Sequence, residues 1–488
     1  MPFDQPGYRV PATPAPPVAA QTLDPRTRRL LEGPIVLTLL RLAWPNVAVM
    51  LAQASTGLIE TFWVSRLGTD ALAGMALVFP GFMMMQMLSG GAMGGGISSA
   101  IARALGGGRR DDANALVLHA IIINLALGLT FSILVLAFGP SLYRALGGEG
   151  GSLDAALRYS DVVFAGTWLV WLMNGLASTI RGTGNMLVPS VTVCAGVALL
   201  VPLSPCLIFG VGPFPAMGMT GAGIAVVSTT VLTAAALACY LVSGRSVVRL
   251  GWARLRRRLF ADILRVGAVA SVTTLQTTLT VALTTALVGI AGSGAIAGYG
   301  TGARLEYLLV PLVFGLGAPL VALVGTNIGA GQNARALRVA LTGGGIAFVL
   351  TEAVGVAAAI WPRAWLGLFS DEPAMITAGA AYLRSVGPAY GFFGLGLALY
   401  FASQGAGKLL WPLLAGFLRM SIAVGGGWIA LSLTGSLGGV FIALSAALVT
   451  YGLLLSSAVA SGAWFRHTRA SVATPAKLPE TGVQEVSS

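Results

Sequence analysis

Residues 244–265 read GRSVVRLGWARLRRRLFADILR and form the most basic stretch of the chain, with seven arginines. Six apolar stretches precede it and six follow it, each long enough to cross a bilayer, for which about 20 residues are needed. An even number of crossings on either side places this stretch and both chain ends on one side of the membrane. The sequence therefore predicts twelve transmembrane helices, divided six and six.

Apolar runs between charged or Gly/Pro-rich breaks define the predicted spans. They cover residues 41–64, 72–101, 115–139, 158–180, 188–210, 219–243, 263–290, 295–328, 337–361, 377–403, 410–433 and 438–464. The second and the eighth are long and rich in glycine, which predicts tilted or irregular helices.

The composition agrees with this count. The chain has 488 residues, of which 9% are charged and 56% apolar, and its mean hydropathy is +0.83. A soluble protein carries about 25% charged residues, so a water-exposed surface cannot be built from this composition. The same figures exclude a disordered chain, a coiled coil and a collagen-like fibre. We expect an all-α polytopic membrane protein.

The formal net charge of +12 comes from 29 Lys and Arg against 17 Asp and Glu. With the predicted spans, 23 of the 29 cations fall on the side of the termini, five on the other side, and Arg304 within the eighth span. Cations are retained on the cytoplasmic side of membranes. This predicts a multi-pass protein of the cytoplasmic (inner) membrane with both termini in the cytoplasm. Nucleic acid, which such a charge suggests in a soluble protein, then needs no role.

Two halves of the chain repeat one another. LGTDALAGMAL from Leu67 matches AGSGAIAGYGT from Ala291, ARALGGGRRDDANAL matches GTNIGAGQNARAL, and RGTGNMLVP matches QGAGKLLWP, at offsets of 223 to 224 residues. Six spans per half give both repeats the same orientation. We therefore expect two six-helix lobes related by a pseudo-two-fold axis along the membrane normal, with a substrate cavity between them.

The predicted organisation has five parts. They are a disordered N-terminus over residues 1–33, an N-lobe over 34–243, a basic cytoplasmic linker over 244–262, a C-lobe over 263–465 and a disordered tail over 466–488. The N-terminus has no apolar core typical of a signal peptide. Cys194, Cys206 and Cys239 lie in apolar segments and only two histidines are present, so we expect no metal site and no cofactor.

Several motifs resemble those of one family of transporters. They are LRLAWPNVAVML and IETFWVSRLGTDALAGMALVFP in the first two spans, RGTGNMLVPSV before the fifth, RLEYLLVPLVFGLGAPLVALVGTNIGAGQNARA in the eighth, and ASQGAGKLLWPLL before the eleventh. Together with the 6+6 repeat, their order resembles the multidrug and toxic compound extrusion (MATE) family from Pro34 to Phe465. The resemblance implies export of cationic or lipophilic compounds, driven by inward H+ or Na+, with alternation between outward-open and inward-open forms.

Ionisable side chains inside a bilayer cost at least a few kcal/mol each, so every one is a functional candidate. Glu60, in the outer part of the first span, is the strongest. A carboxylate in low dielectric can take up a proton near neutral pH, and protonation would then compete with a cationic drug for one site. The position resembles the family's first-helix Asp. The alternative is an outer-end Glu that pairs with Arg66, about 9 Å along the helix, or reaches the headgroups.

Arg304 and Glu306 lie in the eighth span and match a pattern found in part of the family. Two residues apart on a helix, they point in different directions and are not expected to pair with each other. Each needs another partner or water, which predicts a wet C-lobe cavity with Glu306 as a second coupling residue. A structural ion pair between helices explains the same two residues.

Neutral polar and aromatic residues supply the rest of the predicted substrate cavity. The candidates are Gln53, Gln276, Tyr299, Tyr307, Tyr400 and Gln404, with Gln86 and Asn174 as further possibilities. Cation–π contacts and hydrogen bonds would hold a drug there, but helix–helix hydrogen bonding accounts for such residues as well. The run MMMQM over residues 83–87 is either an adaptable drug-binding wall or lipid-facing and core filling.

Departures from the family pattern favour proton coupling over sodium coupling. In many relatives the fifth span carries an Asn and an Asp, whereas Leu200 and Ser204 stand here, and the tenth span has no Asp ahead of Gln404. We therefore expect a drug/H+ antiporter that acts as a monomer on small molecules within membrane lipids. The alternatives are a Na+-coupled drug antiporter and a lipid or lipid-linked oligosaccharide flippase. A membrane-embedded enzyme is disfavoured because the sequence lacks HExxH, CxxC and paired intramembrane aspartates.

Overall fold

A computed structural model describes residues 24–465 and is almost entirely helical across that range. In the N-terminal half the elements are α1 (Pro25–Glu32), α2 (Ile35–Ser65), α3 (Thr69–Gln86), η1 (Met87–Met93), α4 (Gly94–Gly106), α5 (Arg110–Ala145), α6 (Gly150–Ala165), α7 (Thr167–Gly182), α8 (Leu187–Phe209) and α9 (Gly218–Val242). In the C-terminal half they are α10 (Arg257–Gly289), α11 (Ser293–Gly329), α12 (Asn333–Ile360), α13 (Pro362–Leu366), α14 (Pro373–Val386), η2 (Gly387–Ala389), α15 (Tyr390–Ala406), α16 (Leu410–Met420), η3 (Ser421–Gly426), α17 (Gly427–Thr434), α18 (Leu437–Ala460) and η4 (Ala463–Phe465).

The predicted span count is confirmed. Eleven helical segments of the described range are long and apolar enough to cross a membrane, and the pair α6–α7, bent by 47°, supplies the twelfth. The second span is irregular as expected, because the π-helix η1 separates α3 from α4. The eighth span, by contrast, is one uninterrupted helix, α11, although it contains Pro311 and Pro319.

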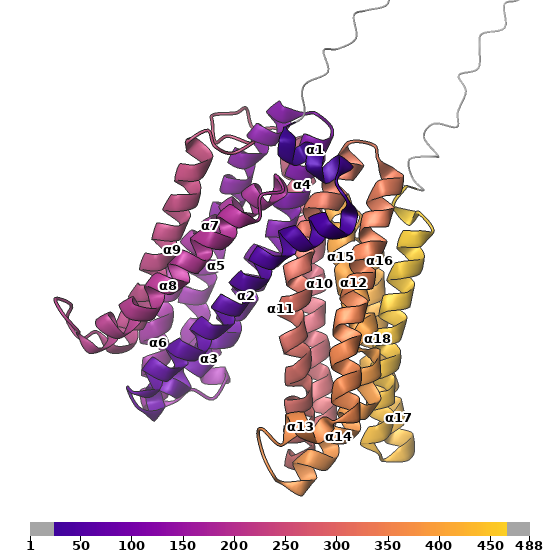
Figure 1. Ribbon diagram of the computed structural model, residues 1–488. Helices are drawn as coiled ribbons and strands as arrows, with labels where there is room; N and C mark the ends of the chain where they lie inside the picture. Colours follow the sequence, from indigo (N-terminus) through magenta and orange to yellow (C-terminus); the bar gives the residue numbers. More distant parts are fainter. Residues whose placement is uncertain (1–23, 466–488) are drawn as a thin grey trace, which may run out of the picture.

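The helices form two lobes, α2–α9 and α10–α18 (Figure 1). The lobes meet at the end where α1 lies, here called the α1 end, and diverge toward the opposite end, where α3, α6, α13 and α14 lie (Figure 1). At the α1 end α4 packs against α10, α11 and α15. Helix α2 runs obliquely between the lobes and packs against both α11 and α8. The lobe interface is therefore built largely from α2 and α4 on one side and α11 on the other.

Small residues allow α4 and α11 to approach closely. A Cβ atom on Gly106 would lie 2.0 Å from the carbonyl oxygen of Thr326, and one on Gly329 would lie 2.2 Å from that of Arg103. Backbone atoms cannot yield to such contacts, so only glycine fits at these positions. Helix pairs in membranes depend on small residues in the same way, because lipid gives no hydrophobic drive for their association.

The prediction of disorder over residues 1–33 is wrong for its last part, because residues 25–32 form α1. Asp24 caps this helix by accepting a hydrogen bond from the backbone of Arg26 at 2.9 Å, and Pro25 starts it. Leu30 and Leu31 are buried, and Asn327 of α11 donates to the Leu30 carbonyl at 3.2 Å. Burial of one apolar face therefore orders a segment that is too short to be helical alone. Residues 1–23 and the predicted tail over 466–488 lie outside the described residues.

The basic linker is shorter than predicted and docks on the N-lobe. Helix α10 already begins at Arg257, so the connection spans residues 243–256. Asp112, in the first turn of α5, accepts from Arg256 at 3.1 Å and also pairs with Arg258. The backbone of Arg256 donates to Nε2 of the buried His119 at 2.9 Å. Asp112 is therefore an anchor for the linker rather than part of a solvated loop.

Candidate functional site

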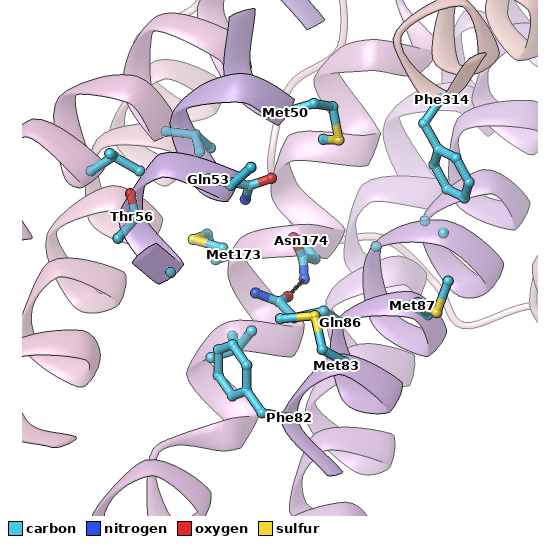
Figure 2. Close-up of a pocket in the computed structure, with 18 of the residues that line it drawn as sticks. Met50, Gln53, Thr56, Phe82, Met83, Gln86, Met87, Met173, Asn174 and Phe314 are labelled. Atoms are coloured by element: carbon cyan, nitrogen blue, oxygen red, sulfur yellow. Dashed lines mark hydrogen bonds between the residues drawn. The ribbon is translucent and has the colours of Figure 1, made fainter. Parts of the chain in front are cut away.

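A cavity of about 670 Å³ lies between the lobes. The N-lobe contributes most of its wall, from α2, α3, η1, α4 and α6–α9, and the C-lobe closes it with α11 and α15. Figure 2 shows the methionine and aromatic side chains that line it, namely Met50, Phe82, Met83, Met87, Met173 and Phe314. Flexible thioethers and aromatic faces fit apolar ligands of varied shape. Met83 and Met87 are thus cavity residues, and Met85 between them is fully buried.

Polar groups in the middle of the cavity are held by one another. Asn174 of α7 donates to Oε1 of Gln86 at 3.1 Å and to the hydroxyl of Ser89 at 2.8 Å (Figure 2 shows the first bond). Gln53 of α2 faces the same space (Figure 2). These amides can offer donors and acceptors to a ligand, beside the methionine and aromatic side chains of the wall.

Glu60 lines the same cavity near the end of α2 and is 9% exposed. Within residues 24–465 its Oε1 atom has no hydrogen-bond partner, and no cation lies within ion-pair distance of the carboxylate. Arg66 is instead stacked on the ring of Phe62, with its guanidinium carbon 5.0 Å from the ring centre. The alternative reading of Glu60, a pair with Arg66, is therefore not realised.

Gln404 is a further predicted residue that reaches this cavity. It lies on α15 and is fully buried, and its amide donates to the carbonyl oxygens of Gly91 at 3.2 Å and Ala92 at 3.3 Å. A Cβ atom on Gly95 would lie 2.1 Å from the Gln404 side chain. Gln404 thus forms part of the cavity wall and a link between the two lobes.

Three predicted residues do not line the central cavity, because their helices turn these positions elsewhere. Gln276 lies between α10 and α16, where it donates to the carbonyl oxygen of Gly416 at 2.8 Å. Tyr400 is buried within the C-lobe core, with its ring 5.3 Å from that of Phe401. Arg304 is exposed, and its guanidinium lies 5.8 Å from the ring centre of Phe369.

Glu306 and Tyr299 belong to a separate, small pocket inside the C-lobe, of about 40 Å³. The hydroxyl of Tyr382 donates to Oε2 of Glu306 at 3.5 Å, and Arg419 lines the same pocket. Arg419 acts electrostatically on Glu306, so Arg419 and not Arg304 is the cation of this pocket. The side chain of Tyr307, also predicted to line a cavity, lies outside what the structure describes.

Two arginines of the described sites were not expected there. The predicted fourth span ends at residue 180, yet Arg181 is still helical and lines the central cavity. The predicted eleventh span begins at residue 410, and Arg419, the tenth residue of α16, lies well inside it. Among residues 24–465 no group of three or more His, Cys, Asp or Glu side chains could hold a metal ion.

The arrangement of two lobes around an amphipathic cavity agrees with the outcome of comparison with known proteins. One family model, MatE, matches residues 45–206 and again residues 270–429, more than half of the chain. The chain belongs to the MATE family. The two matched blocks begin 225 residues apart and end 223 residues apart, one in each lobe, as the internal repeats predict. Members of this family are membrane transporters, and this MATE protein is a multi-pass membrane protein.

Relatives cover most of the chain. The "FAD transporter" of Shewanella oneidensis is 28% identical over 377 residues, 77% of this chain and 82% of that protein. The "Probable multidrug resistance protein NorM" of Thermotoga maritima is 24% identical over 391 residues, 78% of this chain and 82% of that protein. A crystal structure of MATE in the bent conformation is 25% identical, covers 91% of this chain and 99% of its own, and superposes with a TM-score of 0.84.

Proposed function

We propose that this MATE protein is a secondary active antiporter that exports cationic or lipophilic compounds in exchange for protons. The observation that carries the proposal is the carboxylate of Glu60, which is buried in the cavity between the lobes without a hydrogen-bond partner for Oε1 among the described residues. A charged carboxylate is not stable in such a place unless a cation or a proton joins it.

One site then serves both cargo and proton. The ionised Glu60 attracts a cationic compound into the apolar cavity, where methionine and aromatic side chains contact its rings. Protonation neutralises the carboxylate and removes the attraction, so the compound leaves. The buried phenol of Tyr159 lines the same cavity, close enough to Glu60 for the two groups to interact electrostatically. Competition between a proton and a cation for one carboxylate is sufficient for antiport.

Alternating access supplies the direction of transport. We place the α1 end in the cytoplasm, because the basic linker and most cations are on that side and such residues are retained there. The contacts of α4 with α10, α11 and α15 close that end, while the lobes diverge at the other. Rocking of the lobes would open the α1 end to the cytoplasmic side of the inner membrane and close the opposite end.

Glu306 has a supporting role in this proposal. Its pocket is small and belongs to the C-lobe alone, and Arg419 shares it. A second proton site there would have to act through the packing of the C-lobe rather than through contact with cargo. Glu60 therefore carries the main coupling and Glu306 a subsidiary one.

Other transport functions remain as alternatives. A Na+-coupled antiporter would use the same carboxylate with sodium in place of the proton. A flippase for lipids or lipid-linked oligosaccharides is favoured by more cationic cavities than this one, whose lining in the described range contains Arg181 and no other Lys or Arg. Relatives are named for FAD and for multidrug transport, so flavin nucleotides are a second class of cargo for this chain.

Transport by purified protein in liposomes tests the proposal. An imposed pH gradient should drive uptake of ethidium by the wild type, and a Na+ gradient at constant pH should not. Glu60→Gln should abolish the pH-driven transport while the protein remains monodisperse in detergent. Glu352→Gln is the matched control, since Glu352 lies in a span outside the cavity and accepts a hydrogen bond from Gly391 at 2.7 Å. Undiminished transport by Glu60→Gln would remove Glu60 from the mechanism, and activity driven by Na+ alone would replace the proton.

A further inference from the structure

Arg181 is the second charged residue of the central cavity, and its environment differs from that of Glu60. Of the cavity-lining residues described, only these two carry a charge at neutral pH, and the charges are opposite. Arg181 lies at the last turn of α7, whereas Glu60 acts on Tyr159 in α6. The 22 residues from Tyr159 to Arg181 correspond to roughly 30 Å of helical rise, reduced by the bend between α6 and α7. The two charges therefore lie toward opposite ends of the cavity.

The guanidinium of Arg181 lacks a counter-charge. Across residues 24–465 it makes no hydrogen bond, ion pair or ring contact, and its Nε atom is buried without a partner. Two other half-buried arginines of the described residues donate at least one side-chain hydrogen bond each, although Nε of Arg335 is also buried without a partner. Arg103 donates to Ser99 at 2.8 Å and to the Gly405 carbonyl at 3.2 Å, and Arg335 donates to the carbonyl of Gly33. A charge held away from water needs a partner, and no side chain within residues 24–465 supplies one for Arg181.

The groups around Arg181 leave room for an anion. Ser178 precedes it by three residues and so lies on the same face of α7. Gly94 and Gly95 of α4 also line the cavity, where they face Ser178 and Gln404, and the room for an anion is the cavity itself, of about 670 Å³. A guanidinium can bind a phosphate through two parallel hydrogen bonds, which gives both strength and orientation. The Glu60 carboxylate lies toward the other end of the cavity, so its repulsion of an anion bound at Arg181 is weak.

We infer that the α1 end of the cavity is a subsite for the anionic group of an aromatic ligand, bound by Arg181, with phosphate as the group that fits the guanidinium best. The aromatic part lies against Phe82, Phe314 and the methionines of the wall, with Gln86 and Asn174 available to polar ring edges. The ligand class is thus a phosphorylated aromatic heterocycle. The inference rests on the proposed function in one respect, namely that this cavity is the transport site.

Riboflavin and FMN form a suitable pair of probes, because they share one ring system and differ by one phosphate. Binding to the full-length protein in detergent is followed by quenching of flavin fluorescence, without any ion gradient. The wild type should bind FMN more tightly than riboflavin. Arg181→Gln should weaken FMN binding by roughly tenfold or more, the loss of one charge-assisted contact, and should leave riboflavin binding within twofold of the wild type. Arg181→Lys, which keeps the charge, should retain part of the preference, and Arg109→Gln, an exposed arginine at the same end, should retain all of it.

Three outcomes would overturn the inference. The first is equal affinity of the wild type for FMN and riboflavin, and the second is an equal loss of affinity for both flavins in Arg181→Gln. The third is displacement of FMN by phosphatidylglycerol added to the micelles, which would assign Arg181 to a lipid headgroup. Ethidium binding separates this inference from the proposed function. Arg181→Gln removes a positive charge from the cavity and should therefore not weaken binding of the cationic ethidium, whereas failure of proton coupling in liposomes would not alter the equilibrium titrations.

Discussion

The side-chain amide of Gln404 donates a hydrogen bond to the carbonyl oxygen of Gly91, at 3.2 Å, across the boundary between the two lobes. Gly91 belongs to the π-helix η1, and the neighbouring carbonyl of Ala92 accepts from the same amide. Irregular helical turns of this kind are frequent at functional sites. This contact closes the cavity toward α15, so movement of the lobes must break it.

Gln404→Leu should weaken closure at the α1 end. The variant removes two hydrogen bonds, each worth about 1 kcal/mol net, so the ratio of closed to open forms should fall by roughly thirtyfold. Spin labels at Arg110 and Asn333, both exposed near that end, report the separation of the lobes by electron–electron distance measurement. Gln332→Leu, in an exposed turn at the same end, is the control. Identical distance distributions in Gln404→Leu and the wild type would contradict the prediction.

Gly106→Val should prevent the closed arrangement more completely. Its Cβ would meet the carbonyl oxygen of Thr326 at 2.0 Å, a backbone atom that cannot rotate away. We expect the labels at the α1 end to move apart and pH-driven transport to be lost. Gly345→Val tests the substitution alone, since a Cβ at Gly345 meets nothing within 4 Å. The close contact of α4 and α11 would be irrelevant to transport if both variants behaved as the wild type does.

Asp112→Asn should loosen the linker from the N-lobe. Asp112 is 13% exposed, whereas its partners Arg256 and Arg258 are 58% and 61% exposed, so solvent screens the pairs. We expect a loss of about 1 kcal/mol in the free energy of unfolding and a melting temperature that no longer falls with added NaCl. Scanning fluorimetry in detergent measures both. Asp111→Asn, at the exposed neighbouring position, should show neither change; equal effects at both positions would rule out the anchor role.

Arg419→Met should destabilise the C-lobe more than the pair of changes Arg419→Met and Glu306→Gln. The single variant keeps the apolar stem but leaves the Glu306 carboxylate without its cation in a small pocket, whereas the double variant removes both charges. Thermal unfolding in detergent should therefore show partial recovery in the double variant, by a margin of about 1–3 kcal/mol in coupling. Additive losses would show that the two side chains act independently.

The sequence alone predicted the number of spans and their division into two lobes, and it singled out Glu60, which the structure places in the cavity. These features depend on hydropathy along the chain, on repeats at a constant offset and on a charge inside an apolar run, none of which needs knowledge of packing. The second and eighth spans were both predicted to be tilted or irregular; the second contains the π-helix η1, whereas α11 remains a continuous helix around Pro311 and Pro319.

Only the tertiary structure decided which polar side chains share a cavity. Successive helical residues are turned by about 100°, so small differences in helix rotation direct Gln53 into the cavity and Gln276 toward Gly416. Local sequence also cannot show that α1 is ordered by burial of Leu30, because the atoms that cover it belong to α11 and to the turn before α8. Local sequence likewise ended the predicted fourth span at residue 180, one residue before Arg181. Its position facing the cavity, without a counter-charge among the described residues, arises from the packing of α7 against α4.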